Sequence, residues 1–327
     1  MPRCCSTLNP INEEGFSPAA AKKLFDNRKP PACRLEFTRK DVITYRHQQA
    51  ERFSISGIQD KISLRLHRGT LAPVTENGEY ILKPIPSGDH IHFNASVPAN
   101  EHLCMLLAGQ LFNISVPPCA LVEMSDGEPA YLVRRFDRRK DGNKTPQEDF
   151  CQLSNRSEEN ADRNYKYDST QEETGRIVKQ FCAAHRIELE KLFLRHVFNY
   201  VFSNGDAHLK NFSLHQTAHG DHVLTPAYDL LCTSMHIPSE ARCALDMFEH
   251  DETRFFRDNS YYGLEDFSLL ADKFGIEQDY ALFEVNRFEA KLQQVEDLTG
   301  QSYLDSGRRN DFLSRVHDRL KALRADA

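Results

Sequence analysis

One polar stretch between two apolar segments constrains the fold of this chain more than any other feature. The sequence SNGDAHLKNFS covers residues 203–213 and places Asp206 five residues before Asn211. Apolar residues dominate before it, over 197–202, and again over 212–214. A loop of charged and amide side chains keeps a defined shape when packed elements hold both of its ends. The stretch therefore predicts a polar loop anchored to a hydrophobic core.

The offset between Asp206 and Asn211 is that of the kinase catalytic loop, H-R-D-x-x-x-x-N. There the aspartate accepts the proton of the attacking hydroxyl, and the asparagine holds a magnesium ion. A second acidic residue follows at Asp229, within the sequence TPAYDL. Magnesium prefers oxygen ligands, usually one or two carboxylates completed by phosphates and waters. We expect Asp206 to be the catalytic base, and Asn211 and Asp229 to be the metal ligands.

The same residues also suit an ordinary turn. Asn-Gly-Asp is common turn chemistry, with Asn204 or Gly205 at positive φ. The spacing taken alone favours the turn. Asp229 and a series of residues upstream favour the catalytic interpretation.

The upstream segment 54–66 begins with SISG and continues with alternating apolar and polar residues. The alternation predicts a strand, and the small residues before it predict a loop whose backbone N–H groups could cradle phosphates. With one glycine, this loop is also compatible with a plain β-turn. Two further strands are expected over 70–74 and 79–82, joined by a turn at Asn77-Gly78.

Lys83 ends the last of these strands, where a kinase lysine holds the α and β phosphates. An amphipathic helix is expected over 98–112, with Glu101 in its first turn as the partner of Lys83. Each residue also has an ordinary interpretation. A lysine at a strand end commonly reaches solvent, and an acid near a helix start complements the helix dipole.

The remaining periodicity predicts further strands and, later, mostly helices. Strands are expected over 117–122 and 130–136, followed by a hinge or by a solvated basic run. Residues 154–167 are expected to form a mobile surface loop or an activation-type loop. Helices are expected over 170–184, 188–202, 264–274, 279–298 and 308–323, with a short N-terminal helix capped by Ser17 and ending at Phe25.

Composition excludes several classes of protein. The chain has 327 residues and a net charge of −7, which argues against a general nucleic-acid binder. No apolar run has the length of a membrane helix, and the first residues lack a signal-peptide core. The nine cysteines are scattered without a C-x-x-C pair, so neither a zinc site nor a disulfide framework is expected. We expect a cytoplasmic protein.

Strands dominate before residue 136 and helices after it. We expect an α+β, bilobal, kinase-like fold, with an N-lobe over 1–136 and a mostly helical C-lobe over 137–327.

The chain resembles the HipA-like serine/threonine kinases, the toxins of bacterial HipBA-type toxin–antitoxin modules. The matching motifs extend from about residue 50 onward and are SISGIQDK (54–61), LKP (82–84), RFDR (135–138), QEDFCQ (147–152), NGDAHLKN (204–211) and PAYDL (226–230).

The resemblance implies ATP and Mg²⁺ as cofactors and a role for each matching residue. Asp206 is implied as catalytic base, Asn211 and Asp229 as magnesium ligands, and Glu101 as the lysine partner. The implied nucleotide contacts are Ser54, Ile55, Ser56, Gly57, Lys83, Arg135, Phe136, Asp137, Gln152, His208, Asn211 and Asp229, with Asp137 at the ribose. Ser54 and Ser56 are implied sites of autophosphorylation, which the family links to inactivation.

Two departures refine the resemblance. The serine loop begins too early for the N-terminal subdomain of long HipA proteins, so the chain resembles the short form, HipT, of three-gene modules. Partners of the HipS and HipB type are then implied as antitoxins. At the hinge, Arg134 stands where the family usually has a glutamate, which alters any side-chain contact to adenine.

The resemblance implies phosphorylation of an aminoacyl-tRNA synthetase, tryptophanyl-tRNA synthetase for the HipT form, and hence inhibition of translation. No direct nucleic-acid binding and no membrane contact are expected. A small-molecule kinase of related fold remains an open alternative. A nucleotide-dependent binding module is disfavoured because the expected catalytic residues are all present, and a metal-dependent hydrolase is disfavoured because no H-E-x-x-H or similar spacing occurs. The hydrolase would use the histidines of the chain together with its aspartates, namely His196, His208, His215, His219 and His222.

Overall fold

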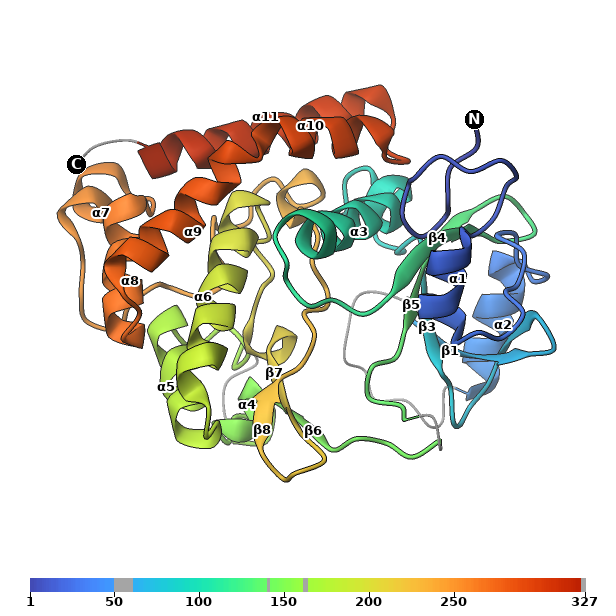
Figure 1. Cartoon of the computed structure of the whole chain (residues 1–327), viewed down its shortest axis with the longest axis horizontal. Helices are drawn as coiled ribbons and strands as arrows, with labels where there is room; N and C mark the ends of the chain where they lie inside the picture. Colours follow the sequence, from blue (N-terminus) through green and yellow to red (C-terminus); the bar gives the residue numbers. More distant parts are fainter. Residues whose placement is uncertain (50–60, 140–141, 161–163, 325–327) are drawn as a thin grey trace.

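The structure is a computed structural model that describes residues 1–49, 61–139, 142–160 and 164–324 (Figure 1). Its first half contains a five-stranded antiparallel sheet in the order β2-β1-β3-β5-β4. The strands are β1 (Ile62–His67), β2 (Thr70–Pro73), β3 (Tyr80–Pro84), β4 (Cys119–Glu123) and β5 (Pro129–Arg134). All five were expected from the sequence, within a few residues at their ends.

Helices cover both faces of this sheet. On one face, α1 (Pro18–Phe25) and α2 (Arg39–Gln49) pack their apolar side chains against residues such as Leu64 and Leu132. On the other face, α3 (Val97–Leu106) packs against neighbours such as Leu121 and Tyr131. Because successive strand residues point to opposite faces, each strand contributes side chains to the hydrophobic core on each face of the sheet. Helices α1 and α2 therefore form a layer on one face of the sheet.

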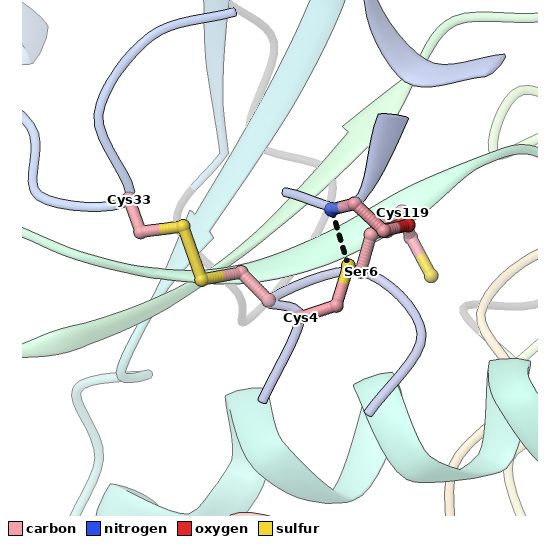
Figure 2. The surroundings of a disulfide bond; sticks show 6 residues. Cys4, Ser6, Cys33 and Cys119 are labelled. Carbon is pink, nitrogen blue, oxygen red and sulfur yellow. Dashed lines mark hydrogen bonds between the residues drawn. A yellow bond between two sulfur atoms is a disulfide. The ribbon is translucent and has the colours of Figure 1, made fainter. Parts of the chain in front are cut away.

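A disulfide ties this N-terminal layer together. Cys5 and Cys33 are joined with an S–S distance of 2.18 Å, and Figure 2 shows the bond beside Cys4 and Cys119. The backbone N–H of Ser17, the N-cap of α1, donates to Cys4 Sγ. The sequence, from which no disulfide framework was expected, did not predict this one bond. The other cysteines are free, and all but Cys243 are buried, as expected of small hydrophobic side chains.

The second half is helical and is built around α6 (His185–Val201), whose residues from Leu192 to Val201 are all buried (Figure 1). The surrounding helices are α5 (Gln171–Phe181), α7 (Arg254–Asn259), α8 (Leu264–Phe274), α9 (Gln278–Ala290), α10 (Leu292–Gln301) and α11 (Ser306–Arg324). Helices α10 and α11 extend toward the N-terminal segment along one edge of the molecule (Figure 1). Among the described residues, no helix combines the length and apolar character needed to span a bilayer.

A second, three-stranded antiparallel sheet lies beside α6, in the order β6-β7-β8. It consists of β6 (Gln147–Asp149), β7 (Ser213–Gln216) and β8 (His222–Leu224), and the short helix α4 (Phe150–Leu153) follows β6. The polar stretch at 203–213 connects α6 to β7. Its two ends are therefore fixed by a buried helix and a sheet, as the apolar flanks predicted.

Two helices differ from expectation. The helix expected over 98–112 is not amphipathic, because every residue of α3 is buried, and it continues as a π-helical turn over Leu107–Leu111. The helix expected over 279–298 is interrupted at Lys291, which separates α9 from α10. The sequence also gave no indication of α2, α4, α7 or the three-stranded sheet.

Candidate functional site

The polar loop begins where α6 ends. Ser203 takes the left-handed conformation, with φ 52°, and turns the chain away from the helix axis. The following residue, Asn204, uses its side-chain amide to donate to Asn199 Oδ1 (3.0 Å) and to the carbonyl of Asp229 (3.3 Å). The expected positive φ at Asn204 or Gly205 is wrong, because the strained position is Ser203. Asn204 joins the two segments expected to share one site.

The second half of the loop fixes the Asn211 amide. Leu209–Asn211 form a 3-10 turn, and Asn211 Nδ2 donates to the carbonyl of Asp206 at 3.1 Å. With the amide nitrogen engaged, Asn211 Oδ1 is the atom left to bind a cation. A carboxamide oxygen and the half-exposed carboxylate of Asp229 are the donors that magnesium prefers, so these residues fit the expected ion.

The side chain of Asp206 is 46% exposed. Its Oδ1 accepts a hydrogen bond from the hydroxyl of Tyr167 and lies 3.9 Å from His208 Nε2. Burial lowers the pKa of His208 to about 4, despite the neighbouring carboxylates, so its imidazole is neutral at pH 7. Its Nδ1 is buried without a hydrogen-bond partner among the described residues. A neutral ring nitrogen of this kind suits a ligand contact.

Lys83 lies at the centre of the predicted phosphate site. Its Nζ is 2.6 Å from Glu101 Oε1 and also pairs with Asp229 Oδ1. Burial would lower the pKa of Lys83, but the two carboxylates outweigh it and raise the pKa, so the lysine stays cationic. Burial would likewise raise the pKa of Asp229, and the Lys83 ammonium outweighs it and lowers the pKa. The structure thus brings together the lysine, its expected glutamate and the expected metal-binding aspartate.

Helix α3 contacts both Lys83 and the segment that follows Asp229. Glu101 is fully buried in its second turn, rather than in the first turn as expected, and faces Lys83. The preceding residue, Asn100, donates to the carbonyl of Cys232 (3.0 Å) and accepts from the N–H of the same residue (3.1 Å). Cys232 lies three residues after Asp229. Adjacent side chains on one helix therefore support the lysine and the Asp229 segment.

The segment after β5 reaches the same region. The ring of Phe136 stacks on Tyr228, with centroids 5.8 Å apart, directly beside Asp229. Arg135 donates to both carboxylate oxygens of Asp137, at 2.9 and 2.6 Å. Asp137 and Arg135 therefore engage each other, and the proposed ribose contact stays a prediction. Arg134 turns toward the N-terminal layer, where it donates to the carbonyl of Lys23.

Gln152, another predicted nucleotide contact, has a capping role in the structure. Gln152 forms a capping box with Asp149 at the start of α4, so its side-chain oxygen is engaged in capping. Ser54, Ile55, Ser56 and Gly57 lie outside the described residues. Their expected roles in phosphate binding and autophosphorylation stay predictions.

Several residues of the site were missed from the sequence. Asn204 and Asn100 bridge segments distant in the chain, and Tyr228 supports Phe136. Tyr167, in the segment expected to be mobile or activation-type, contacts the loop directly. The tyrosines at 165 and 167, the sole aromatic residues between Phe150 and Phe181, were the one available signal for that segment.

A separate hollow with a volume of about 940 Å³ lies between the N-terminal segment, β4 and the turn from α10 to α11. Its walls include Arg34, Phe93 and Tyr303, and none of the predicted site residues lines it. In the described part of the chain, no three His, Cys, Asp or Glu side chains gather in an arrangement able to hold a metal ion. His196, one histidine of the hydrolase alternative, is instead buried against Thr174.

The chain is similar in sequence to proteins named as kinases. It is 28% identical to "Putative kinase" of Haemophilus influenzae over 98% of this chain and 97% of that protein. It is 30% identical to "Putative kinase Y4mE" of Sinorhizobium fredii over 85% of this chain and 65% of that protein.

Two solved structures share its fold. HipA of Shewanella oneidensis, in a complex with HipB and its operator DNA, superposes with a TM-score of 0.66 at 21% identity, over 88% of this chain and 71% of that one. The Helicobacter pylori proinflammatory kinase CtkA superposes with a TM-score of 0.53 at 11% identity, over 80% and 93%. The expected α+β, bilobal, kinase-like fold is thereby confirmed. The expectation of no nucleic-acid contact gains no support, because the Shewanella complex contains DNA.

The sequence pattern of the HipA-like C-terminal domain matches residues 53–297, well over half of the chain. This range contains every residue predicted for the site. The chain therefore belongs to the HipA-like C-terminal domain family.

Proposed function

We propose that this protein is a serine/threonine protein kinase that uses Mg-ATP. The observation that carries the proposal is the contact of Lys83 with both Glu101 and Asp229, next to a loop that presents Asp206. Phosphoryl transfer needs neutralised phosphate oxygens, fixed metals and an in-line hydroxyl, with little covalent help from the protein. The described cluster has a suitable residue for each need.

In this proposal each residue of the cluster has one role in phosphoryl transfer. Lys83 binds the ATP phosphates, and Glu101 holds Lys83 in place. Asn211 Oδ1 and the Asp229 carboxylate hold magnesium, which neutralises charge on the phosphates when bound. Asp206 accepts the proton of the attacking hydroxyl. Phe136, Asp137, His208 and Gln152 are proposed contacts of the nucleotide, and the division into lobes at 136/137 is part of the same proposal.

The biological role follows by analogy with the family. We propose a toxin of the HipT form, with an aminoacyl-tRNA synthetase as substrate and autophosphorylation on Ser54 or Ser56. Antitoxins of the HipB and HipS type are proposed as partners. Support comes from family membership and from the Shewanella HipA structure, which contains HipB.

The first test incubates the purified protein with labelled ATP, magnesium and either tryptophanyl-tRNA or glutamyl-tRNA synthetase. Asp206→Asn, which keeps the side-chain shape but removes the base, is the matched control. We expect label on the tryptophanyl enzyme and on a peptide that contains Ser54 and Ser56, and at least a hundredfold less with the variant, as is roughly typical for loss of a general base. Label on another protein would reject the proposed substrate. ATP binding without turnover would favour a binding module.

A further inference from the structure

Residues 165–167 pack along the polar loop through all three positions. The carbonyl of Lys166 accepts from the N–H of Leu209 at 3.1 Å, which ties the backbones together. Tyr165 is buried, and Lys210 Nζ lies 4.9 Å from the centre of its ring. The 165–167 segment is therefore fixed on the loop independently of any contact with Asp206.

The third position, Tyr167, contacts the proposed base. Its hydroxyl donates to Asp206 Oδ1, and its ring meets His208 edge-on with centroids 5.1 Å apart. Lys166 Nζ lies 4.8 Å from the centre of the Tyr167 ring. Burial, together with the neighbouring Asp206, raises the pKa of the Tyr167 hydroxyl, so it remains a donor at any physiological pH. The Asp206 carboxylate thus has a permanent donor on one oxygen.

An exposed carboxylate without such a donor is poorly oriented. Rotation about the terminal torsion of aspartate is broad, and the Asp206 side chain is 46% exposed. A general base must lie within hydrogen-bonding reach of the hydroxyl it deprotonates, in a defined orientation. A donor fixed to Oδ1 restricts this rotation and leaves Oδ2 to accept from the substrate hydroxyl.

We propose that Tyr167 is a positioning residue, which orients the Asp206 carboxylate through its hydroxyl for proton transfer from the substrate. The inference rests on the proposed function of Asp206 and assigns a role to a segment that the sequence left as a loop. An alternative role for Tyr167 is inhibition, in which its hydroxyl occupies the position of the substrate hydroxyl at Asp206. An inhibitory tyrosine would have to move away before catalysis. The hydrogen bond between Lys166 and Leu209 and the contact of the Tyr167 ring with His208 oppose such a movement.

The test compares Tyr167→Phe with Tyr165→Phe, which removes a hydroxyl from the same segment without touching Asp206. Phosphate transfer from Mg-ATP is followed on the synthetase, or on the chain itself, with Asp206→Asn alongside. Loss of one hydrogen bond to a charged group predicts a fall in kcat of roughly ten- to a hundredfold for Tyr167→Phe. The KM for ATP, the Kd for ATP and the melting temperature should stay near those of the parent. Tyr165→Phe should lower kcat much less.

The outcomes distinguish failure of the positioning role of Tyr167 from failure of the proposed kinase function. An unchanged or increased kcat for Tyr167→Phe, with Asp206→Asn inactive, overturns the positioning role and leaves the proposed function intact. A rise in the Kd for ATP equal to the loss of kcat also overturns it, because the tyrosine would then support the whole site. A parent that transfers no more phosphate than Asp206→Asn rejects the proposed function, and the inference with it.

Discussion

Gly205 is required by close packing rather than by backbone conformation. A Cβ at this position would lie 2.6 Å from the carbonyl oxygen of Ala241 and 2.6 Å from Glu240 Cδ. Its backbone N–H also donates to Thr233 Oγ1 at 2.7 Å. The segment around residue 240 therefore lies directly against the proposed catalytic loop. Any side chain at Gly205 must move that segment or move Asp206.

We predict that Gly205→Ala lowers the transfer rate strongly, because displacement of a catalytic group by about 1 Å can cost roughly a hundredfold. The matched control is Gly300→Ala in α10, where a Cβ meets nothing within 4 Å. That change should leave transfer unaltered and stabilise the fold by about 0.5–1 kcal/mol. Transfer assays and urea unfolding of both variants provide the measurement. Equal activity of the two variants would contradict the steric argument.

The catalytic residues that the sequence predicts lie close together in the chain or follow a known order. Asp206 and Asn211 share one loop, and Lys83 comes at a strand end, so local pattern was enough to find them. Tyr167 and Asn100 reach the site from elsewhere in the chain, through contacts with residues far away in sequence. Periodicity and spacing carry no information on such pairs.

At the scale of elements, α11 contacts the turn that leads from α6 into the loop at 203–213. Arg319 is buried on this helix, donates to Ser203 Oγ at 3.1 Å, and lies with its guanidinium carbon 5.1 Å from the centre of the Tyr200 ring. Ser203 is the residue in the left-handed conformation. The last helix of the chain thus holds the turn between α6 and the loop. The sequence predicted α11 from its apolar spacing but not this contact.

We predict that Arg319→Met destabilises the fold by roughly 1.5–3 kcal/mol, the range for a lost hydrogen bond to a charged group. Arg324→Met, on the same helix, removes an exposed ion pair with Glu289 and should cost less than about 0.5 kcal/mol. Urea unfolding of both variants tests the difference. Similar losses for the two would show that Arg319 does not anchor the turn.

The element that the sequence described least well is α3. The spacing of its apolar residues predicted a helix with one buried face. In the structure every residue of α3 is buried between the β-sheet and the helical half. Amphipathic patterns assume that one side of a helix meets water. Asn100, Glu101 and His102 are polar residues of this helix, and all three are buried, whereas the sequence predicted a partner, Lys83, for Glu101 alone.

At the scale of the whole molecule, buried histidines link stability to pH. Burial lowers the pKa of His102 to about 4, of His196 to about 3 and of His208 to about 4. In the unfolded chain each takes up a proton below about pH 6.5, whereas the folded protein does not. The unfolded state then binds more protons, so stability is lost as pH falls below 6.5. Burial raises the pKa of Glu240 to about 7 and opposes this trend.

A comparison of the parent with His196→Gln isolates the contribution of His196 to the pH dependence of the unfolding free energy. Between pH 7 and pH 5 we expect the parent to lose roughly 1–2 kcal/mol more unfolding free energy than the variant, whatever their absolute stabilities. Urea unfolding at both pH values measures the two losses. Parallel losses would indicate that His196 is protonated in the folded protein.

The adjacent positions of Asn100 and Glu101 have a mechanical consequence. One residue holds the backbone at Cys232, and the next holds the lysine at the end of β3. A displacement of α3 that freed the lysine would therefore also pull on the segment that carries Asp229. As long as both contacts persist, the two halves of the molecule move together at this point. An opening that preserves them is a rotation about an axis near α3, with a displacement that increases with distance from that helix.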